Sequence, residues 1–218
     1  MSKVVELNLW RKKLGGVPEW VWERTDLETL ILADNELTEL SERIGGLQSL
    51  HTLDLGHNQL AELPERLGDL TRLSGFLYLH DNRLASIPPS MKRLKNLRYL
   101  NLSENAFTDF PEVVCGMSAL AELRITDNQI ETLPESIADL KSLRELHLRN
   151  NRLATLPTSV CELKELRQID LRANPLTSLP DCIATLPRLE KLDLRWVSSM
   201  TWPKWMNDLE ARGCLVYR

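Results

Sequence analysis

Leucine and other apolar residues recur at fixed positions along the chain, with a period of 23 residues. The cleanest copy, Leu143–Glu165, reads LRELHLRNNRLATLPTSVCELKE. Within it, Leu146 and Leu148 alternate with polar residues, which is the period expected of a short β-strand with one buried face. A fixed repeat of this length predicts a solenoid, in which each copy forms one coil and neighbouring coils bury a continuous core together.

One asparagine follows the predicted strand in seven copies. The seven residues are Asn35, Asn58, Asn82, Asn105, Asn128, Asn151 and Asn174, at intervals of 23 residues apart from one of 24. An asparagine side chain carries both donors and acceptors, so it can satisfy backbone groups that a tight bend leaves unpaired. We therefore expect these residues to stack as a ladder along the solenoid.

The second half of each copy contains a corner and a short helical segment. Leu156-Pro157 marks the corner, because proline fixes φ, lacks an N–H group and holds the preceding residue in an extended conformation. Val160, Leu163 and Leu166 then follow at a spacing of three, which predicts a short helical or 3₁₀ turn. The chain is therefore expected to be an α/β solenoid, with a parallel sheet on a concave inner face and helical turns outside.

The full pattern, L-x-x-L-x-L-x-x-N-x-L-x-x-L-P-x-x-I-x-x-L-x-x, resembles the leucine-rich repeat family in its 23-residue form. Within that family it is similar to intracellular proteins of the Ras-scaffold and Ras-suppressor type, to plant Ras-group-related repeat proteins and to many bacterial repeat proteins. The resemblance covers essentially the whole chain. It implies a right-handed horseshoe or superhelix that recognises another protein, and by analogy a small GTPase is one candidate partner.

The repeat predicts a single domain over residues 1–218, with capping units at 1–26 and 189–218 around seven regular copies at 27–188. All six tryptophans lie in the terminal units: Trp10, Trp20, Trp22, Trp196, Trp202 and Trp205. Terminal repeats must close an exposed core end, so capping is the preferred interpretation and an aromatic ligand site the alternative. Residues 206–212 are expected to form a short helix and residues 215–217 a final edge strand. An extra residue within Leu73–Leu77, which includes a glycine, predicts a bulge before one strand.

Composition narrows the compartment and the class of partner. The net charge is −4 with a pI near 5.7, so no global basic field favours nucleic acid. There is no signal-peptide-like start and no long apolar run, which predicts a cytoplasmic protein without a membrane span.

Cys115 and Cys161 occupy the same repeat position two coils apart. At sheet spacing their Cα atoms should be roughly 10 Å apart, which is too far for a disulfide. All four cysteines, including Cys182 and Cys214, are therefore expected to be reduced.

Two patches of candidate partner-binding residues emerge when the non-leucine strand positions are aligned on the asparagines. An aromatic group comprises Phe76, Tyr78, His80 and Tyr99, and exposed aromatic side chains on a rigid sheet make good interface anchors. A basic group comprises Arg124, His147, Arg149, Arg172 and Arg195. Stacked like charges are unfavourable unless compensated. Either Asp170 and Asp193 compensate them internally, or they await an acidic partner.

The first hypothesis is a non-catalytic module that binds another protein on the concave face, with a monomer favoured. The second is an anion or nucleic-acid site along Arg149, Arg172 and Arg195, and the third is a structural spacer. Catalytic and phosphate-binding motifs are missing, so neither an enzyme nor a cofactor is expected. No metal site is predicted. Asp34, His57 and Asp81 could invite a cation at one edge, but a solvated loop edge is the preferred interpretation.

Overall fold

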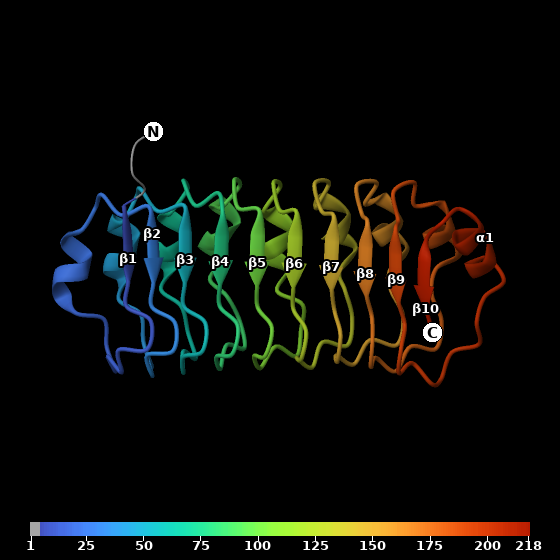
Figure 1. Cartoon of the computed structure of the whole chain (residues 1–218), viewed down its shortest axis with the longest axis horizontal. Coiled ribbons are helices and arrows are strands. Elements are labelled where there is room, and N and C mark those ends of the chain that lie inside the picture. Colours follow the sequence, from blue (N-terminus) through green and yellow to red (C-terminus); the bar gives the residue numbers. More distant parts are fainter. Residues whose placement is uncertain (1–4) are drawn as a thin grey trace.

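The computed structural model describes residues 5–218 as a right-handed solenoid of stacked coils (Figure 1). Ten strands lie side by side in chain order, and every neighbouring pair is parallel. Such connections between parallel strands are right-handed almost without exception. The sheet is an open row that does not close on itself. The predicted α/β solenoid with a parallel sheet is confirmed.

Each strand has three residues, and equivalent repeat positions pair across the sheet. Leu100 lies opposite Leu123, for example, and Leu123 opposite Leu146. The strands are β1 Glu6–Asn8, β2 Thr29–Ile31, β3 Thr52–Asp54, β4 Phe76–Tyr78, β5 Tyr99–Asn101, β6 Glu122–Arg124, β7 Glu145–His147, β8 Gln168–Asp170, β9 Lys191–Asp193 and β10 Leu215–Tyr217.

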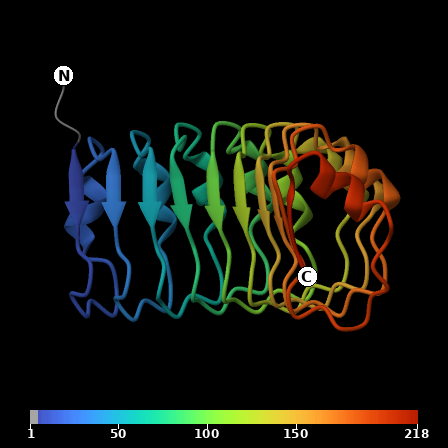
Figure 2. The ribbon, with the colours of Figure 1, turned by 45° about the vertical axis from the view of Figure 1, so that its right-hand side comes forward.

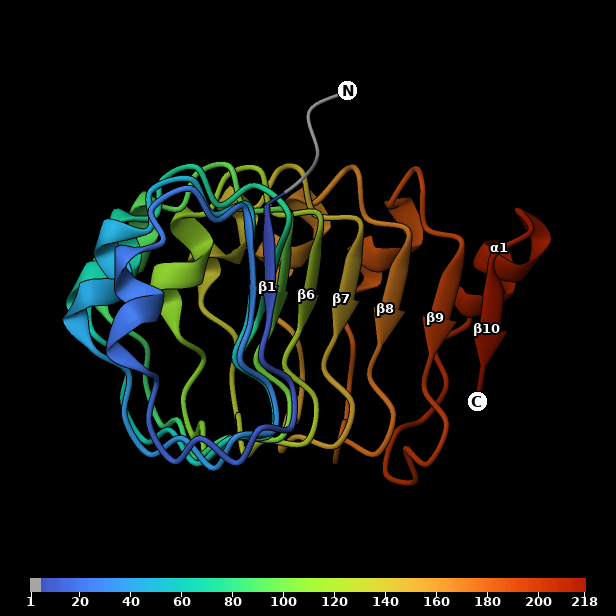
Figure 3. The ribbon, with the colours of Figure 1, turned by 60° about the vertical axis from the view of Figure 1, so that its left-hand side comes forward.

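Short 3₁₀ helices form the side of each coil opposite the sheet, as Figures 2 and 3 show. They are η1 Glu19–Glu23, η2 Glu42–Gly46, η3 Glu65–Asp69, η4 Pro89–Arg93, η5 Glu112–Gly116, η6 Glu135–Asp139, η7 Thr158–Glu162 and η8 Asp181–Thr185. One α-helix, α1 at Met206–Ala211, precedes β10, so both elements predicted for the last residues are present. None of the helices in the described part of the chain is long and apolar enough to cross a membrane.

Proline sets the start of nearly every 3₁₀ helix. Seven of the eight are preceded by proline, with φ between −59° and −75°, the range that the pyrrolidine ring imposes. The exception is Ser41, where proline was expected from the repeat. Its φ is −64°, and its hydroxyl accepts a hydrogen bond from the backbone N–H of Arg43 at 3.2 Å. A serine cap therefore replaces the proline corner without changing the path of the chain.

The leucine slots form one continuous core from the first coil to the last. The strand residue Leu146, Leu148 just after the strand, and Val160, Leu163 and Leu166 in and after η7 have no exposed surface. Each such side chain contributes about 1.5–3 kcal/mol by leaving water. Because each coil leaves its apolar edges exposed until a neighbour covers them, stability is shared along the stack.

The predicted asparagine ladder is present, and each of its side chains joins two coils. Asn58 shows the pattern: its amide donates to the carbonyl oxygens of Leu55 and Gly56 in its own coil, and to Leu32 of the preceding coil, at 2.9–3.1 Å. Its oxygen accepts from the backbone N–H groups of Asn35 and Leu37 at 3.0–3.1 Å. These backbone groups lie in the buried bend after the strand, so the side chain replaces the water they would otherwise need.

The residue before each ladder position has a positive φ. In the coils whose ladder position is asparagine, Asp34, His57, Asp81, Glu104, Asp127, Asn150 and Ala173 have φ between 50° and 60°. Asp, Asn and His are enriched in this left-handed region because their short polar side chains tolerate it. The run of acidic residues and one histidine at this slot is therefore a consequence of backbone geometry.

Four of the six tryptophans are exposed, which corrects the idea that they close the core ends together. Trp22 is buried, at 5% exposure, and packs in the core as a cap residue should. Trp205 is half-buried, and its indole N–H donates to Asp181 at 2.8 Å. The exposed four are Trp10, Trp20, Trp196 and Trp202. Trp20 lies on η1, and the other three lie in loops outside the strands and helices.

Cys161 and Cys182 form a disulfide between η7 and η8, with Cα atoms 5.8 Å apart. The expectation of four reduced cysteines is therefore wrong for this pair, while Cys115 and Cys214 are free and buried. Comparison of equivalent slots missed the bond because Cys182 lies 21 residues after Cys161, two short of the period. The disulfide joins neighbouring helical turns, and such bonds are typical of oxidising compartments.

Replacement of a central ladder residue, Asn128→Ala, should lower the free energy of unfolding by about 3 kcal/mol, because it leaves several buried backbone groups unpaired. Urea denaturation measures the change. Asn207→Ala, at an exposed position of α1, is the matched control and should change stability by less than about 0.5 kcal/mol. Equal losses in the two variants would contradict the role of the ladder.

Reduction of the Cys161–Cys182 bond should destabilise the protein by about 3 kcal/mol, as expected for a closed loop of about 20 residues. Dithiothreitol should lower the urea midpoint of the wild type, but not that of a Cys161→Ser/Cys182→Ser variant.

Burial raises the pKa of the Cys115 and Cys214 thiols, so both should react with a thiol reagent only after denaturation. Four reactive thiols in unreduced, denatured protein would contradict the disulfide.

Candidate functional site

The sheet face is the side of the ten strands that points away from the leucine core, and three columns of side chains cover it. Two columns are the first and third residues of each strand, whose middle residue points into the core. The third column lies two residues beyond the end of each strand. All the predicted partner-binding residues belong to these columns, so the structure places both predicted groups on one face.

The aromatic group is assembled on β4 and β5 as predicted. The ring of Tyr99 lies 5.4 Å from that of Phe76 and 5.1 Å from that of Tyr78, in tilted arrangements. Phe76 is 46% exposed, whereas the two tyrosines are half-buried. Burial raises the pKa of Tyr99 to about 12, and its protonated hydroxyl can donate a hydrogen bond. The group offers a rigid apolar surface with polar rims.

The extra residue of the 24-residue interval lies immediately before β4. Pairing of β3 with β4 begins at Leu53 and Leu77, one residue later than in every other described pair, although the N–H of Gly75 still bonds to the carbonyl of His51 at 2.9 Å. The predicted bulge therefore lies at this point. It takes Phe76 out of the pairing with β3 while Phe76 still pairs with Tyr99 of β5. The insertion accompanies the most exposed ring of the aromatic group.

The basic group lines a hollow of about 310 Å³ on β6 to β9. Arg124, His147, Arg149 and Arg172 surround it as predicted, together with Lys191. Arg195 lies beyond the hollow, beside Tyr217 of β10, with its guanidinium carbon 5.2 Å from the ring centre. The other lining residues are Thr126, Gln168, Ile169 and Asp170.

Each of the four arginines is paired with a carboxylate, so the internal compensation considered from the sequence is present. Arg172 binds Asp170 through two hydrogen bonds of 2.8 and 2.6 Å, and Arg195 binds Asp193 in the same way at 2.9 and 2.7 Å. The remaining pairs are Arg124 with Glu122 at 2.6 Å and Arg149 with Asp127 at 2.5 Å. The paired hydrogen bonds of Arg172 and Arg195 fix the orientation of their guanidinium planes.

Asp193 is the buried centre of this arrangement. Its side chain is 1% exposed and also lies 3.6 Å from Arg172. Burial alone would raise the pKa of Asp193, but the hydrogen bonds from Arg195 outweigh it and hold the pKa below its usual value. With Lys191 included, this half of the face has five cationic side chains and five carboxylates: Glu122, Asp127, Glu145, Asp170 and Asp193. It therefore carries no net positive charge.

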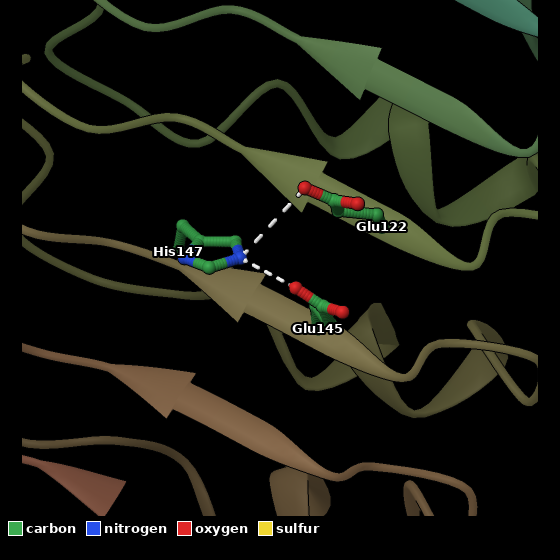
Figure 4. A group of neighbouring side chains, drawn as sticks. All are labelled: Glu122, Glu145 and His147. Carbon is green, nitrogen blue, oxygen red and sulfur yellow. Dashed lines mark hydrogen bonds and ion pairs between the residues drawn. The ribbon is translucent and has the colours of Figure 1, made fainter. Parts of the chain in front are cut away.

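His147 lies between two glutamates of neighbouring strands (Figure 4). Its Nε2 is 3.1 Å from the Oε2 atom of Glu145 and 3.8 Å from the Oε1 atom of Glu122. Glu122 and Glu145 are direct partners in the β6–β7 register, where like charges repel unless something neutralises them. Arg124 bonds to the Glu122 oxygen that faces His147 and so neutralises one of the two carboxylates. The three side chains could geometrically hold a cation, but a guanidinium already fills part of that space.

Two exposed aromatic residues at the C-terminal end were not among the predicted site residues. Trp196 is 69% exposed and lies 5.8–5.9 Å from the guanidinium carbons of Arg172 and Arg195. Tyr217 flanks Arg195 and lies 5.7 Å from the Lys191 ammonium. Aligning the last strand with the columns could have found Tyr217, because it pairs with Asp193. We call Trp196 and Tyr217 the C-terminal aromatic pair.

The edge formed by Asp34, His57 and Asp81 does not assemble as one cluster. Asp34 pairs with Arg11, whereas His57 bonds to Asp81 through Nδ1 and Oδ2 at 2.6 Å. The Nε2 atom of His57 lies 3.2 Å from that of His80, a residue predicted for the aromatic group. The rings of Tyr78 and His80 are 6.0 Å apart, so His80 belongs to both arrangements.

Comparison with known proteins agrees with this architecture. A family profile described as a leucine-rich repeat region matches residues 18–126 and 119–211. None of the curated proteins compared with the chain matches it significantly. Among solved structures, the Leptospira interrogans leucine-rich repeat protein LIC12759 is 28% identical with a TM-score of 0.75, over 96% of this chain and 65% of that one.

Two plant receptor structures are also similar. The leucine-rich repeat ectodomain of the Arabidopsis thaliana receptor kinase GASSHO1/SCHENGEN3, in complex with CASPARIAN STRIP INTEGRITY FACTOR 2, is 28% identical with a TM-score of 0.81, over 98% of this chain and 26% of that one. The plant peptide hormone receptor RGFR1, in complex with RGF2, is 25% identical with a TM-score of 0.76, over 100% of this chain and 34% of that one. The chain thus spans less than two thirds of the length of these structures.

Arg195→Ala should lower the urea midpoint clearly, because it removes the main partner of the buried Asp193 carboxylate. The matched control is Arg188→Ala, which breaks an exposed pair with Glu165 and should have almost no effect. A lowered carboxyl pKa stabilises the fold above the unfolded-state pKa and loses this effect as pH falls through the folded value. The difference between Arg195→Ala and wild type should therefore shrink in acid, and a constant difference would contradict the assignment.

Proposed function

The chain belongs to the leucine-rich repeat family, and we propose that it is a non-catalytic recognition module that binds an extended segment of another protein along its sheet face. Members of this family commonly mediate protein–protein recognition. The observation that carries the proposal is the order of features on one face. The aromatic group, the arginine-lined hollow and the C-terminal aromatic pair follow one another from strand to strand across the sheet.

The aromatic group supplies apolar anchoring. Phe76 is exposed beside two tyrosines whose rings are held by mutual contact, so little side-chain entropy is lost when a partner covers them. Aromatic residues dominate the energy of many protein interfaces because they bury a large area at a fixed position. The segment that binds here should present an apolar side chain.

The hollow favours an acidic group on the partner. Arg172 and Arg195 use Nε and Nη2 for their aspartate partners, and the described residues provide no hydrogen-bond partner for their Nη1 atoms. The aspartates thus orient guanidinium groups that keep free N–H donors, and Lys191 adds an ammonium group at the hollow. A carboxylate can accept from such oriented donors, and an arginine that is already fixed loses little entropy on binding.

The spacing of the two regions sets the length of the segment. From β4 to β9 there are five strand steps of about 4.8 Å, or about 24 Å. An extended chain advances about 3.3 Å per residue, so an apolar and an acidic side chain about seven residues apart would reach both regions. Two of the similar structures described above are receptors in complex with a ligand, and one of them is a peptide hormone receptor, which supports an extended ligand.

The remaining expectations fit this proposal to different degrees. Binding of nucleic acid through Arg149, Arg172 and Arg195 is disfavoured, because carboxylates already neutralise these residues. In the proposal the protein is monomeric, and residues 1–26 and 189–218 close the ends of the core. A small GTPase partner rests on analogy alone. A cytoplasmic location stays a prediction, and the disulfide removes cysteine usage as an argument for it.

Selection from a phage-displayed library of random peptides tests the proposal. Enriched peptides should carry an apolar or aromatic residue and an acidic residue about seven positions apart. Phe76→Ala and Lys191→Ala should each weaken binding of a selected peptide about tenfold, the usual range for an interface anchor being 1–2 kcal/mol. Trp20→Ala is the matched control, because Trp20 is equally exposed but lies on η1, opposite the sheet.

Two results would argue against the proposal. Peptides bound equally by the wild type and a Phe76→Ala/Lys191→Ala variant would place recognition elsewhere. Enrichment of acidic peptides without apolar residues, with affinity that falls steeply with salt, would favour the anion-binding alternative. Arg172 and Arg195 are poor first choices for substitution, because replacing either one removes a partner of the buried Asp193 carboxylate and would also destabilise the fold.

A further inference from the structure

The His57 and His80 side chains converge at the N-terminal half of the sheet face. Their Nε2 atoms are 3.2 Å apart, and their rings are almost perpendicular at an angle of 79°. Two ligand nitrogens at 2.0–2.1 Å from one tetrahedral zinc ion are about 3.3 Å apart. We propose that His57 and His80 form a surface site for a divalent transition metal of the zinc class, with its other coordination positions open.

Asp81 gives the site a second layer. Its Oδ2 atom lies 2.6 Å from Nδ1 of His57 and accepts a hydrogen bond from the N–H group of that nitrogen. The lone pair of the His57 ring is then on Nε2, directed at His80. A carboxylate behind a ligating histidine fixes the tautomer and strengthens the ligand, as in many metal sites. His57 is therefore set in the form that a metal requires before any metal arrives.

Gly56 makes the approach of the two rings possible. A Cβ atom at this position would lie 2.4 Å from Cε1 and 2.8 Å from Nδ1 of His80, closer than any real contact. Glycine therefore leaves space for the His80 ring to lie against the neighbouring coil, beside His57. Gly56 is not at a positive φ, so alanine would fit the backbone there but displace the ring.

The contact between the two rings determines which nitrogen of His80 carries the proton. If His80 donates through Nε2, its Nδ1 atom is an acceptor, and this atom is buried and has no partner. Binding of a metal at Nε2 instead requires the neutral ring to carry its proton on Nδ1, so this atom changes from an acceptor to a donor.

The local charge favours a cation at this site. Asp54, Asp81 and Glu104 act on the His80 ring as negative charges. Among the described residues, no arginine or lysine pairs with Asp81. The cluster in Figure 4 differs, because Arg124 bonds to the glutamate oxygen that faces His147. Imidazole nitrogen suits zinc, copper and nickel, so these ions are the expected class.

Titration of tag-free protein with zinc chloride, followed by calorimetry at neutral pH, tests the site. The wild type should bind one ion per chain. His57→Ala and His80→Ala should each abolish measurable binding, while Asp81→Asn should weaken it about ten- to hundredfold by removing the second layer. Gly56→Ala should also weaken binding about tenfold or more, although it keeps both ligands. Thermal melting checks that each variant is folded.

His51→Ala and His147→Ala are the matched controls and should bind zinc as the wild type does. His51 is exposed and bonds to Ser74 at 3.0 Å, and His147 belongs to the Glu122–Glu145 cluster. Failure of the wild type to bind zinc would overturn the proposal. Binding lost in His147→Ala but retained in His57→Ala would also overturn it and move the site to the cluster in Figure 4.

Discussion

The turn at the end of each strand is the constraint on which the rest of the solenoid depends. A residue in the left-handed region reverses the chain, and the asparagine after it bonds to its own coil and the preceding one. Because this side chain satisfies buried backbone groups on both coils, it fixes how far one coil can shift against the next. Equivalent slots then lie opposite each other, and the side chains of the sheet face fall into columns.

The sequence predicts well whatever a single coil determines from its own residues. Leucine alternation, the Leu-Pro corner and the asparagine slot predict the strands, the 3₁₀ turns and the ladder, because each depends on local chemistry repeated in every copy. Residues 206–211 and 215–217 were predictable for the same reason. The aromatic group could be placed on one face because its members follow directly from the strand register.

Features that depend on side-chain direction between coils were not predictable in the same way. Cys182 lies outside the slot of Cys161, so only the path of the helical turns brings their sulfur atoms together. Whether an arginine turns toward its own aspartate or toward solvent depends on rotamers that no repeat specifies, and the same holds for the exposed tryptophans. The approach of His80 to His57 depends on the missing side chain of Gly56, which a search for chemical groups overlooks.

Arg172 and Arg195 both offer donors to a partner and stabilise the fold, so substituting either residue would affect binding and stability together. Their carboxylate partners hold the guanidinium planes, and the guanidinium groups in turn hold the buried Asp193 carboxylate. A surface built in this way is stiff because its polar groups are already committed to each other. Such stiffness favours selectivity: a partner gains only where its own groups fit donors that cannot reorient.

The parallel register also fixes the distances between binding regions on the sheet face. Each coil contacts only its neighbours, and every step between strands has the same length, about 4.8 Å. The distance from the aromatic group to the arginine-lined hollow can therefore change only by whole coils. Insertion of one repeat between β5 and β6 would lengthen the ligand that fits by one or two residues and leave both binding regions intact.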